Sequence, residues 1–250
     1  MSLFEAKNVD FRYKDEPKLV LENVNLELLE NSINVLVGPS GIGKSTLFNL
    51  AAGYLQPTKG AMFMKGEKIT GPSWQRGVVF QDMALYPWLN VAENILFGPK
   101  VRNLDKHVFK AEFQVLLEET GLDEYERKYV YELSGGLRQR VALARSFINH
   151  PAMLMLDESF SALDNFTRQE MHAILFRLWE KIKNCVFIIT HDIDEAIYLG
   201  QNVIVLNSLD ATSATIVQNT SNPYFRKEIG KLALDNNYVV FRQRLLDMIK

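Results

Sequence analysis

Cysteine is almost absent from this chain, whose 250 residues include one, Cys185. A single thiol cannot close an intramolecular disulfide, so we expect the fold to be held by its apolar core and to suit a reducing compartment. Cys185 opens the apolar run 185–189, and a thiol in such a run is predicted to be buried and inert.

Long hydrophobic runs are missing too. The apolar stretches fall far short of the ~20 residues that a membrane-spanning helix requires. Segment 1–5 also lacks a basic region followed by an apolar one. We therefore expect neither a membrane anchor nor a signal peptide in this sequence.

Neither sign of charge dominates. With 28 Lys and Arg against 30 Asp and Glu, the formal net charge is −2, which gives no general attraction to nucleic acid. We expect no nucleic-acid partner. The hydrophobic fraction of 47% is enough for a substantial core, so the sequence predicts one compact domain over 1–250, or one with a subdomain.

What the sequence does contain is a glycine-rich segment directly after the apolar run 33–37. Positions 38–46 read GPSGIGKST and match the pattern G-x-x-x-x-G-K-[ST]. Glycines let a backbone turn tightly with its N–H groups inward, and the N-terminus of a following helix favours an anion. The predicted nucleotide ligands are Gly38, Pro39, Ser40, Gly41, Ile42, Gly43, Lys44, Ser45 and Thr46. In this loop Lys44 would reach the β- and γ-phosphates of ATP and Ser45 would hold Mg²⁺; the alternative is a plain strand-turn-helix corner.

Strand-like and helix-like patterns alternate along the chain, which predicts an α/β fold. The apolar strands are expected at 33–37, 77–80, 153–156, 185–190 and 203–206. A helix is expected over 46–52, ending at Gly53. The segment 207–222 is predicted to be a loop or weak strand.

The stretch 82–150 carries no strand signal, and we interpret it as a helical insertion in the α/β core. One helix is expected to begin at Asp105 and to end at Gly121, and a second to span 135–149 before Pro151. The apolar positions of the first helix are Val108, Phe109, Phe113, Leu116 and Leu117. The predicted organisation is a catalytic core of 1–81 and 151–225, a helical subdomain of 82–150 and a helical tail of 226–250.

The apolar strand at 153–156 ends in two adjacent acids, Asp157 and Glu158. Beside a phosphate loop, such a pair is better explained by a cation and a proton transfer than by a solvated turn. We assign Asp157 to Mg²⁺ and Glu158 to the attacking water.

The segment 133–140 reads LSGGLRQR. Here Ser134, Gly135 and Gly136 open a helix, which is a second anion-binding geometry, although Ser134 is equally well explained as an ordinary helix cap. At this point the sequence resembles the ATP-binding cassette (ABC) family, whose signature is Leu-Ser-Gly-Gly followed by an Arg-Gln-Arg run. The resemblance covers nearly the whole chain and implies a P-loop ATPase core with a mixed sheet and an inserted helical subdomain.

The family resemblance assigns roles to four further residues. Gln81 matches the glutamine that contacts Mg²⁺ or the attacking water, and His191 matches the histidine that contacts the γ-phosphate. Asp164 matches a loop that acts across a dimer, but it is equally well explained as a helix cap. Tyr13 matches the aromatic residue that stacks on adenine. Taken singly, such residues are more often surface, structural or core residues.

The resemblance also implies assembly. In the family the phosphate loop of one cassette and the signature of another face the same ATP. A homodimer is therefore implied, in which residues 134–136 of one chain contact nucleotide held by Lys44 and Ser45 of its partner. The chain departs from the family at 159–164, where Ser-Phe-Ser-Ala-Leu-Asp replaces Pro-Phe-Gly-Ala-Leu-Asp, and at 200–202. The first departure changes loop stiffness without removing a reacting group.

Segment 82–98, which contains Met, Tyr and Trp, resembles the family's groove for a helix of a membrane subunit, although part of it is expected to be internal core. Segments 70–81 and 86–89 resemble a branch of importers for nitrate, sulfonates such as taurine, and bicarbonate. That branch implies a peripheral ATPase at the cytoplasmic face of the membrane, with a two-copy permease and an extracytoplasmic solute-binding protein as partners. The alternatives are a non-transport ABC ATPase and a nucleotide-binding regulatory module without turnover.

Overall fold

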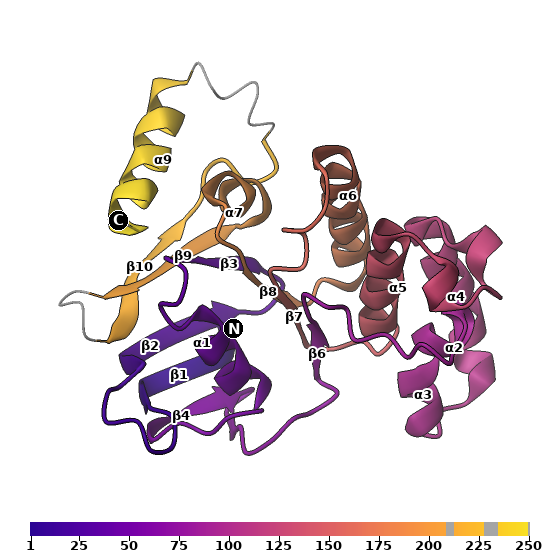
Figure 1. Ribbon diagram of the computed structural model, residues 1–250, viewed down its shortest axis with the longest axis horizontal. Helices are drawn as coiled ribbons and strands as arrows, with labels where there is room; N and C mark the ends of the chain where they lie inside the picture. Colours follow the sequence, from indigo (N-terminus) through magenta and orange to yellow (C-terminus); the bar gives the residue numbers. More distant parts are fainter. Residues whose placement is uncertain (209–212, 228–234, 250) are drawn as a thin grey trace. The chain divides into compact units, whose positions relative to one another are not determined.

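The computed structural model describes residues 1–208, 213–227 and 235–249. The chain divides into two compact units, one made of Met1–Ser73 with Cys185–Lys250 and the other of Trp74–Asn184. Figure 1 shows the helices and strands of each unit. Among the described residues, no helix combines the length and apolar character needed to cross a membrane.

The first unit contains a mixed sheet with the strand order β5-β4-β1-β2-β10-β9-β3-β8. Its strands are β1 (Ser2–Phe11), β2 (Leu21–Leu29), β3 (Ile33–Val37), β4 (Lys59–Met64), β5 (Glu67–Lys68), β8 (Cys185–Ile189), β9 (Asn202–Ser208) and β10 (Ala214–Ser221). Strand β3 pairs in parallel with β8 and β9, whereas β1 pairs antiparallel with β2 and β4. The helices are α1 (Lys44–Ala52), α7 (Ile193–Leu199) and α9 (Asn236–Ile249).

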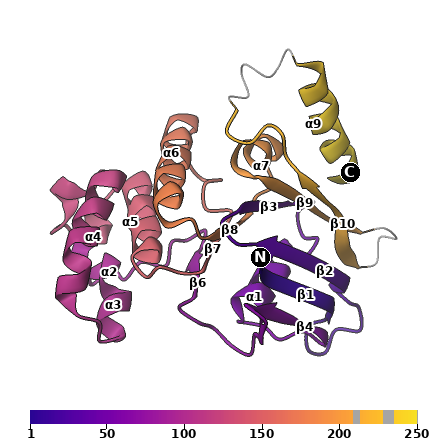
Figure 2. The ribbon, with the colours of Figure 1, turned by 180° about the vertical axis from the view of Figure 1, so that it is seen from behind.

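Helix α9, yellow in Figures 1 and 2, packs against β9 and α7 of the same unit. The predicted tail therefore contains a helix, while 228–234 and 250 lie outside the described residues. In the predicted loop or weak strand at 207–222, β10 forms a full antiparallel partner of β9, and 209–212 lie outside the described residues.

The second unit holds the parallel pair β6 (Arg76–Val79) and β7 (Met153–Asp157), together with most of the helices. These are α2 (Val91–Ile95), α3 (Phe97–Val101), α4 (Lys106–Thr120), α5 (Gly135–Phe147) and α6 (Asn165–Ile182), with short 3₁₀ turns η1 (Asp123–Tyr125) and η2 (Val130–Glu132). Helices α2, α4 and α6 all contact α5, which is the centre of this unit (Figure 2). The predicted helical character of 82–150 is confirmed.

All the apolar strands predicted from the sequence are present, with ends shifted by at most two residues. Strands β1, β2, β4 and β5 were not predicted. In β2 every core-facing residue is followed by an exposed one, as in Leu26 and Leu28, so no continuous apolar run marks it. An alternating pattern, rather than an apolar run, was the signal available for this part of the sheet.

Helix α4 confirms the predicted helix, and Phe113, Leu116 and Leu117 are buried as expected. The side chain of Val108, the first apolar position named for this helix, is 69% exposed. The buried face follows steps of three and four residues from Phe113, and Val108 lies five residues before Phe113, which places it about 140° away around the helix. The proposed division into a core, a helical subdomain and a tail stays a prediction.

Candidate active site

The glycine-rich segment connects β3 to α1 in the first unit. All five residues of β3 are buried, and the strand ends where the loop begins. A Cβ atom at Gly38 would lie 2.3 Å from the carbonyl oxygen of Leu206, so only glycine fits there. Gly41 and Gly43 have φ angles of 79° and 113°, in the left-handed region that favours glycine, and Gly43 is the N-cap of α1. The loop therefore turns directly from a buried strand into a helix N-terminus.

Lys44 places its ammonium group inside this loop. The residue is buried, and its Nζ donates hydrogen bonds of 2.9 Å to the carbonyl oxygens of Gly38 and Pro39. Burying a positive charge is favourable only with such oxygen partners or with an anion nearby. Ser45, the next residue, is exposed in the first turn of α1. The loop thus combines a fixed cation, an exposed hydroxyl and the N-terminus of a helix.

Tyr13 lies beside the same helix start. Its hydroxyl group is 3.0 Å from Oγ1 of Thr46, and its ring packs edge-on against Phe11 with centroids 5.0 Å apart. The side chain remains 45% exposed. An aromatic ring is therefore anchored next to the phosphate loop with part of its surface open to solvent.

His191 follows the strand next to β3. In the parallel pair, Leu36 is opposite Ile189, and the backbone N–H of Thr190 donates to the carbonyl of Leu36 at 3.1 Å. Parallel strands end at the same edge of a sheet, so His191 and the first residue of the phosphate loop leave that edge side by side. Asp192, in contrast, accepts bonds from two backbone N–H groups and caps α7.

The second unit repeats this arrangement with β6 and β7. Val79 is opposite Leu156, so Gln81 and the acids Asp157 and Glu158 follow neighbouring parallel strands at one edge. Gln81 is exposed, and Oδ1 of Asp157 is a buried atom at the end of β7. Glu158 has a φ angle of 43°, a left-handed conformation that is unusual for a residue other than glycine. A carboxylate pair and an amide are thus brought together within this unit.

The segment 134–136 forms the start of α5, in the same unit. Ser134 is the N-cap, and its hydroxyl accepts a 3.3 Å bond from the backbone N–H of Leu137. A Cβ at Gly135 would meet no described atom within 4 Å, whereas one at Gly136 would lie 2.8 Å from Cγ2 of Thr167. The helix start therefore presents open backbone at Gly135 and a close contact at Gly136.

Comparison with known proteins decides the family. The profile of the family described as ABC transporter matches residues 21–161, more than half of the chain. This chain belongs to the ABC transporter family. It binds ATP and is a transport ATPase, which agrees with a phosphate loop in one unit and a carboxylate pair in the other.

A taurine import ATP-binding protein, TauB, of Pseudomonas aeruginosa is 38% identical over 248 residues, which cover 97% of this chain and 93% of that protein. A dimeric ATP-binding cassette, MJ0796, in a post-hydrolysis state with ADP and Pi, has a TM-score of 0.73 at 28% identity and covers 88% of this chain and 98% of its own. The structure of cbiO1 from Clostridium perfringens, part of the ABC transporter complex cbiONQ, has a TM-score of 0.79 at 24% identity. The match covers 97% of this chain and 99% of cbiO1. The α/β P-loop fold with a mixed sheet is confirmed.

The helix-cap explanations for two ABC motif residues are correct at the local level. Asp164 accepts bonds of 3.0 Å from the backbone N–H groups of Phe166 and Thr167 and one of 2.7 Å from the Thr167 hydroxyl. These bonds hold the pKa of the Asp164 carboxyl below its ordinary value. Ser134 caps α5 by accepting the bond from the Leu137 N–H. Capping fixes where α5 and α6 begin. An intersubunit role for either residue stays a prediction.

The departures from the ABC pattern at 159–164 carry contacts that the sequence did not indicate. The buried hydroxyl of Ser159 donates to the carbonyl of Val79, at the end of β6, at 3.1 Å. The hydroxyl of Ser161 donates to the carbonyl of Glu158 at 2.8 Å, and the Ser161 N–H donates to the same oxygen at 3.2 Å. Both serines therefore fix the backbone that carries Glu158. Because they bond to carbonyl groups, which nearly every residue has, no sequence pattern points to them.

Proposed function

We propose that this chain is the ATP-hydrolysing subunit of an importer for a small solute of the nitrate, sulfonate or taurine type. The observation that carries the proposal is the phosphate loop of the first unit, with the Lys44 ammonium buried among loop carbonyls and His191 leaving the neighbouring strand. The similarity to a taurine import ATP-binding protein over 97% of the chain supports the import direction.

The proposed roles follow from the chemistry of each side chain. Glu158 accepts the proton of the water that attacks the γ-phosphate, and His191 contacts that phosphate. Lys44 balances the charge of the β- and γ-phosphates, and Tyr13 stacks on adenine. The partly exposed ring of Tyr13, anchored to Thr46, supports its placement next to the nucleotide.

Mg²⁺ fits the donor set that these motifs offer. Ser45, Gln81 and Asp157 supply hydroxyl, amide and carboxylate oxygens, the ligand type that Mg²⁺ prefers. Oδ1 of Asp157 is a buried atom at the end of β7, and carboxylate oxygens are ligands through which proteins bind Mg²⁺. Bound Mg²⁺ would neutralise part of the phosphate charge during hydrolysis.

We further propose that two copies of the chain share each nucleotide. Residues 134–136 of one copy would face the phosphates held by Lys44 and Ser45 of the other, and Asp164 would lie in the same interface. The open backbone at Gly135 leaves room for a phosphate there. The similarity to a dimeric cassette at 28% identity supports a homodimer.

A surface of the second unit suits the permease. A pocket of about 300 Å³ is lined by Asp82, Met83, Leu85, Pro87, Val130, Tyr131 and Arg138. Trp88, which follows the lining residue Pro87 in the sequence, is 69% exposed. Fully buried Asn94 bonds both the N–H and the carbonyl of Tyr86, which fixes the backbone leading to Trp88. Exposed aromatic residues on a fixed backbone are typical anchors for a protein partner.

In this proposal the chain is peripheral to the cytoplasmic face of the membrane, bound to two permease subunits that receive solute from an extracytoplasmic binding protein. Phosphate release from ATP tests turnover. We expect it to require Mg²⁺ and to fall by about 10²–10⁴ in Glu158→Gln while ATP binding is kept, as when a general base is removed. Turnover at the unmutated rate in Glu158→Gln would remove that role.

Transport is tested by purification with the permease. Trp88→Ala is expected to lose the permease with little change in melting temperature, because the side chain is mostly exposed. Tyr86 is half-buried against Phe97, with ring centroids 4.3 Å apart, so it belongs in part to the internal core. Replacing Tyr86 would therefore also change stability, which makes it a less specific test of permease binding than Trp88. A Trp88→Ala chain that still binds the permease would exclude this surface, and a chain that hydrolyses ATP but binds no permease would favour a non-transport ABC ATPase.

A further inference from the structure

One side chain of the helix that begins at the ABC signature reaches the segment that follows Gln81. Arg145 lies on α5, and its Nη1 and Nη2 donate bonds of 2.8 Å each to the carbonyls of Ala84 and Met83. Its guanidinium carbon also lies 5.4 Å from the centre of the Tyr86 ring. A single planar group therefore contacts three nearly consecutive residues that are about 60 positions away in the sequence.

The backbone at these contacts is strained. Met83 and Ala84 have φ angles of 62° and 44°, in the left-handed region, although neither is glycine. A left-handed conformation is disfavoured for each of these residues, because the Cβ atom lies too close to the following carbonyl oxygen. The strain persists only where surrounding groups hold it, and the Arg145 guanidinium bonds the carbonyls of both residues. Arg145 thus stabilises the path of the chain between Gln81 and Tyr86.

The chemistry of this contact requires arginine. A guanidinium presents its donors in a fixed plane and binds two oxygens at once, and it also packs on an aromatic face. Lysine would keep the charge but would concentrate it at one point. Burial lowers the pKa of Arg145 from its ordinary value, which lies so high that the group still carries its charge at neutral pH.

The contact joins two functional parts of the second unit. At one end of α5, Ser134 and Gly135 form the helix start that is proposed to meet the partner's nucleotide. Near the other end, Arg145 holds the backbone that leads from Gln81 to Tyr86 and Trp88. A helix of this length moves as a rigid rod, so a displacement at its start is passed to Arg145.

We propose that Arg145 is a positioning residue that couples the signature helix to the permease-facing segment 82–88. This inference rests on the proposed function, since it assigns a route by which nucleotide binding reaches the permease. Arg145 does not touch the reacting atoms. Its effect appears in the coupling between hydrolysis and the permease rather than in ATP affinity.

The first test uses the isolated chain, independently of any permease. Amide hydrogen exchange in 82–86 is compared among the unmutated chain, Arg145→Lys and the matched control Arg140→Lys. Arg140 is on the same helix but bonds Glu170 and the carbonyl of Thr120. Exchange in 82–86 is expected to accelerate about tenfold in Arg145→Lys and to stay unchanged in Arg140→Lys. A tenfold change corresponds to the loss of one charge-assisted hydrogen bond. Unchanged exchange would overturn the proposal.

The second test uses the assembled transporter. The measured quantity is the ratio of permease-stimulated turnover to basal turnover. If the bonds from Arg145 carry the coupling, this ratio is expected to fall about tenfold in Arg145→Lys, while the KM for ATP stays unchanged. Arg140→Lys should leave the ratio unchanged. A normal ratio despite faster exchange would reduce Arg145 to a local structural role.

If Arg145→Lys does not fold, Arg145→Gln, which keeps side-chain donors without the charge, takes its place in both tests. Should the unmutated chain bind no permease, the proposed function fails, while the exchange result still stands.

Discussion

At the scale of single residues, two serines hold Glu158 in place. Glu158 adopts a left-handed backbone conformation, which costs free energy unless neighbouring groups stabilise it. Ser161 donates two bonds to the Glu158 carbonyl, and Ser159 ties the same turn to Val79. These hydroxyl bonds restrain the turn at the two positions where the usual ABC pattern has Pro and Gly. The position of the proposed general base therefore depends on side chains that take no part in the reaction.

Ser161→Ala is expected to lower kcat for ATP hydrolysis while leaving the KM for ATP unchanged. The fall should lie between about threefold and a hundredfold, because a neutral hydrogen bond contributes about 1 kcal/mol and misplacement of a reacting group costs more. Ser161→Thr, which keeps the hydroxyl, should restore the rate. Ser146→Ala is the matched control, since it removes a hydroxyl bond to the Val78 carbonyl without touching this turn. Equal rates in Ser161→Ala and the unmutated chain would contradict the assignment.

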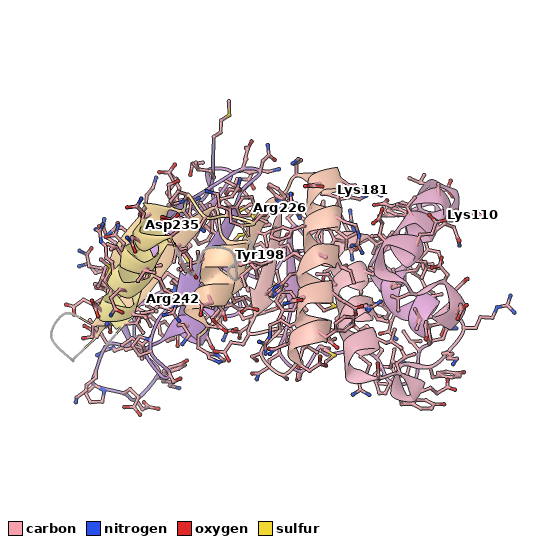
Figure 3. All side chains as sticks on the ribbon, turned by 90° about the horizontal axis from the view of Figure 1, so that it is seen from above. Lys110, Lys181, Tyr198, Arg226, Asp235 and Arg242 are labelled. Atoms are coloured by element: carbon pink, nitrogen blue, oxygen red, sulfur yellow. The ribbon has the colours of Figure 1, made fainter. Side chains whose placement is uncertain are left out.

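At the scale of elements, α9 is attached to α7 through one carboxylate. Arg242 donates from Nε to Oδ1 of Asp194 at 2.6 Å and from Nη2 to Oδ2 at 2.9 Å, and the Tyr238 hydroxyl donates to Oδ1 at 3.1 Å. Figure 3 shows Arg242 on α9 and Tyr198 on the neighbouring α7. The bond from Arg242 is the main reason that the pKa of Asp194 lies below its ordinary value. Helix α7 begins two residues after His191, so α9 supports the element that follows this histidine.

The stability that this ion pair contributes should depend on pH. Because the folded-state pKa of Asp194 is depressed, the contribution is fully present above the unfolded value, about 3.9, and is lost as the pH falls below it. Both side chains are more than one-third exposed, so after allowance for solvent screening we expect about 1 kcal/mol. Urea unfolding of Arg242→Met should show this loss at pH 7.

The difference between Arg242→Met and the unmutated chain should shrink as the pH falls below about 4, because Asp194 becomes protonated in both. Burial and the Asp194 charge raise the pKa of Tyr238 to about 12, so its hydroxyl stays a donor across this range. A difference that is equally large at pH 7 and pH 3 would indicate lost packing by the arginine stem rather than the ion pair.

At the scale of the whole molecule, the ATPase motifs are divided between two compact units. The first holds Tyr13, the phosphate loop and His191, and the second holds Gln81, the signature, the acidic pair and Asp164. In the proposed dimer, the signature of one chain also serves the nucleotide of the other. Turnover then requires a second copy, whereas nucleotide binding by the phosphate loop does not.

Ser134→Arg is expected to leave ATP binding by a single chain intact and to abolish turnover, because a long cation would occupy the place of the partner's γ-phosphate. ATP titration and phosphate release measure the two properties. Ser134→Ala is the comparison variant: it removes the hydroxyl, including its cap bond from the Leu137 N–H, without adding a cation, at a cost of about 0.5–2 kcal/mol of helix stability. Hydrolysis by Ser134→Arg at the unmutated rate, measured with the permease present, would exclude this dimer.

The amino-acid sequence by itself determined the features that depend on neighbouring residues. The phosphate loop follows from glycines at positions that need a left-handed backbone or a close approach, such as Gly38 and Gly43. The strands β3, β7 and β8 are readable because both faces are buried, which leaves a continuous apolar run. Helix caps such as Asp164 are also readable from the sequence, because the cap bonds join residues only two or three positions apart.

Only the tertiary structure decided the contacts between distant positions. It showed that Ser159 reaches Val79, that Arg145 reaches Met83 and Ala84, and that α9 is joined to α7 through Asp194. In the first two cases the acceptor is a backbone carbonyl, which carries no mark of residue type. In the third, an aspartate and an arginine 48 positions apart pair only because the chain folds back on itself. Sequence patterns encode the periodicity of single elements, whereas such pairings depend on how elements pack against one another.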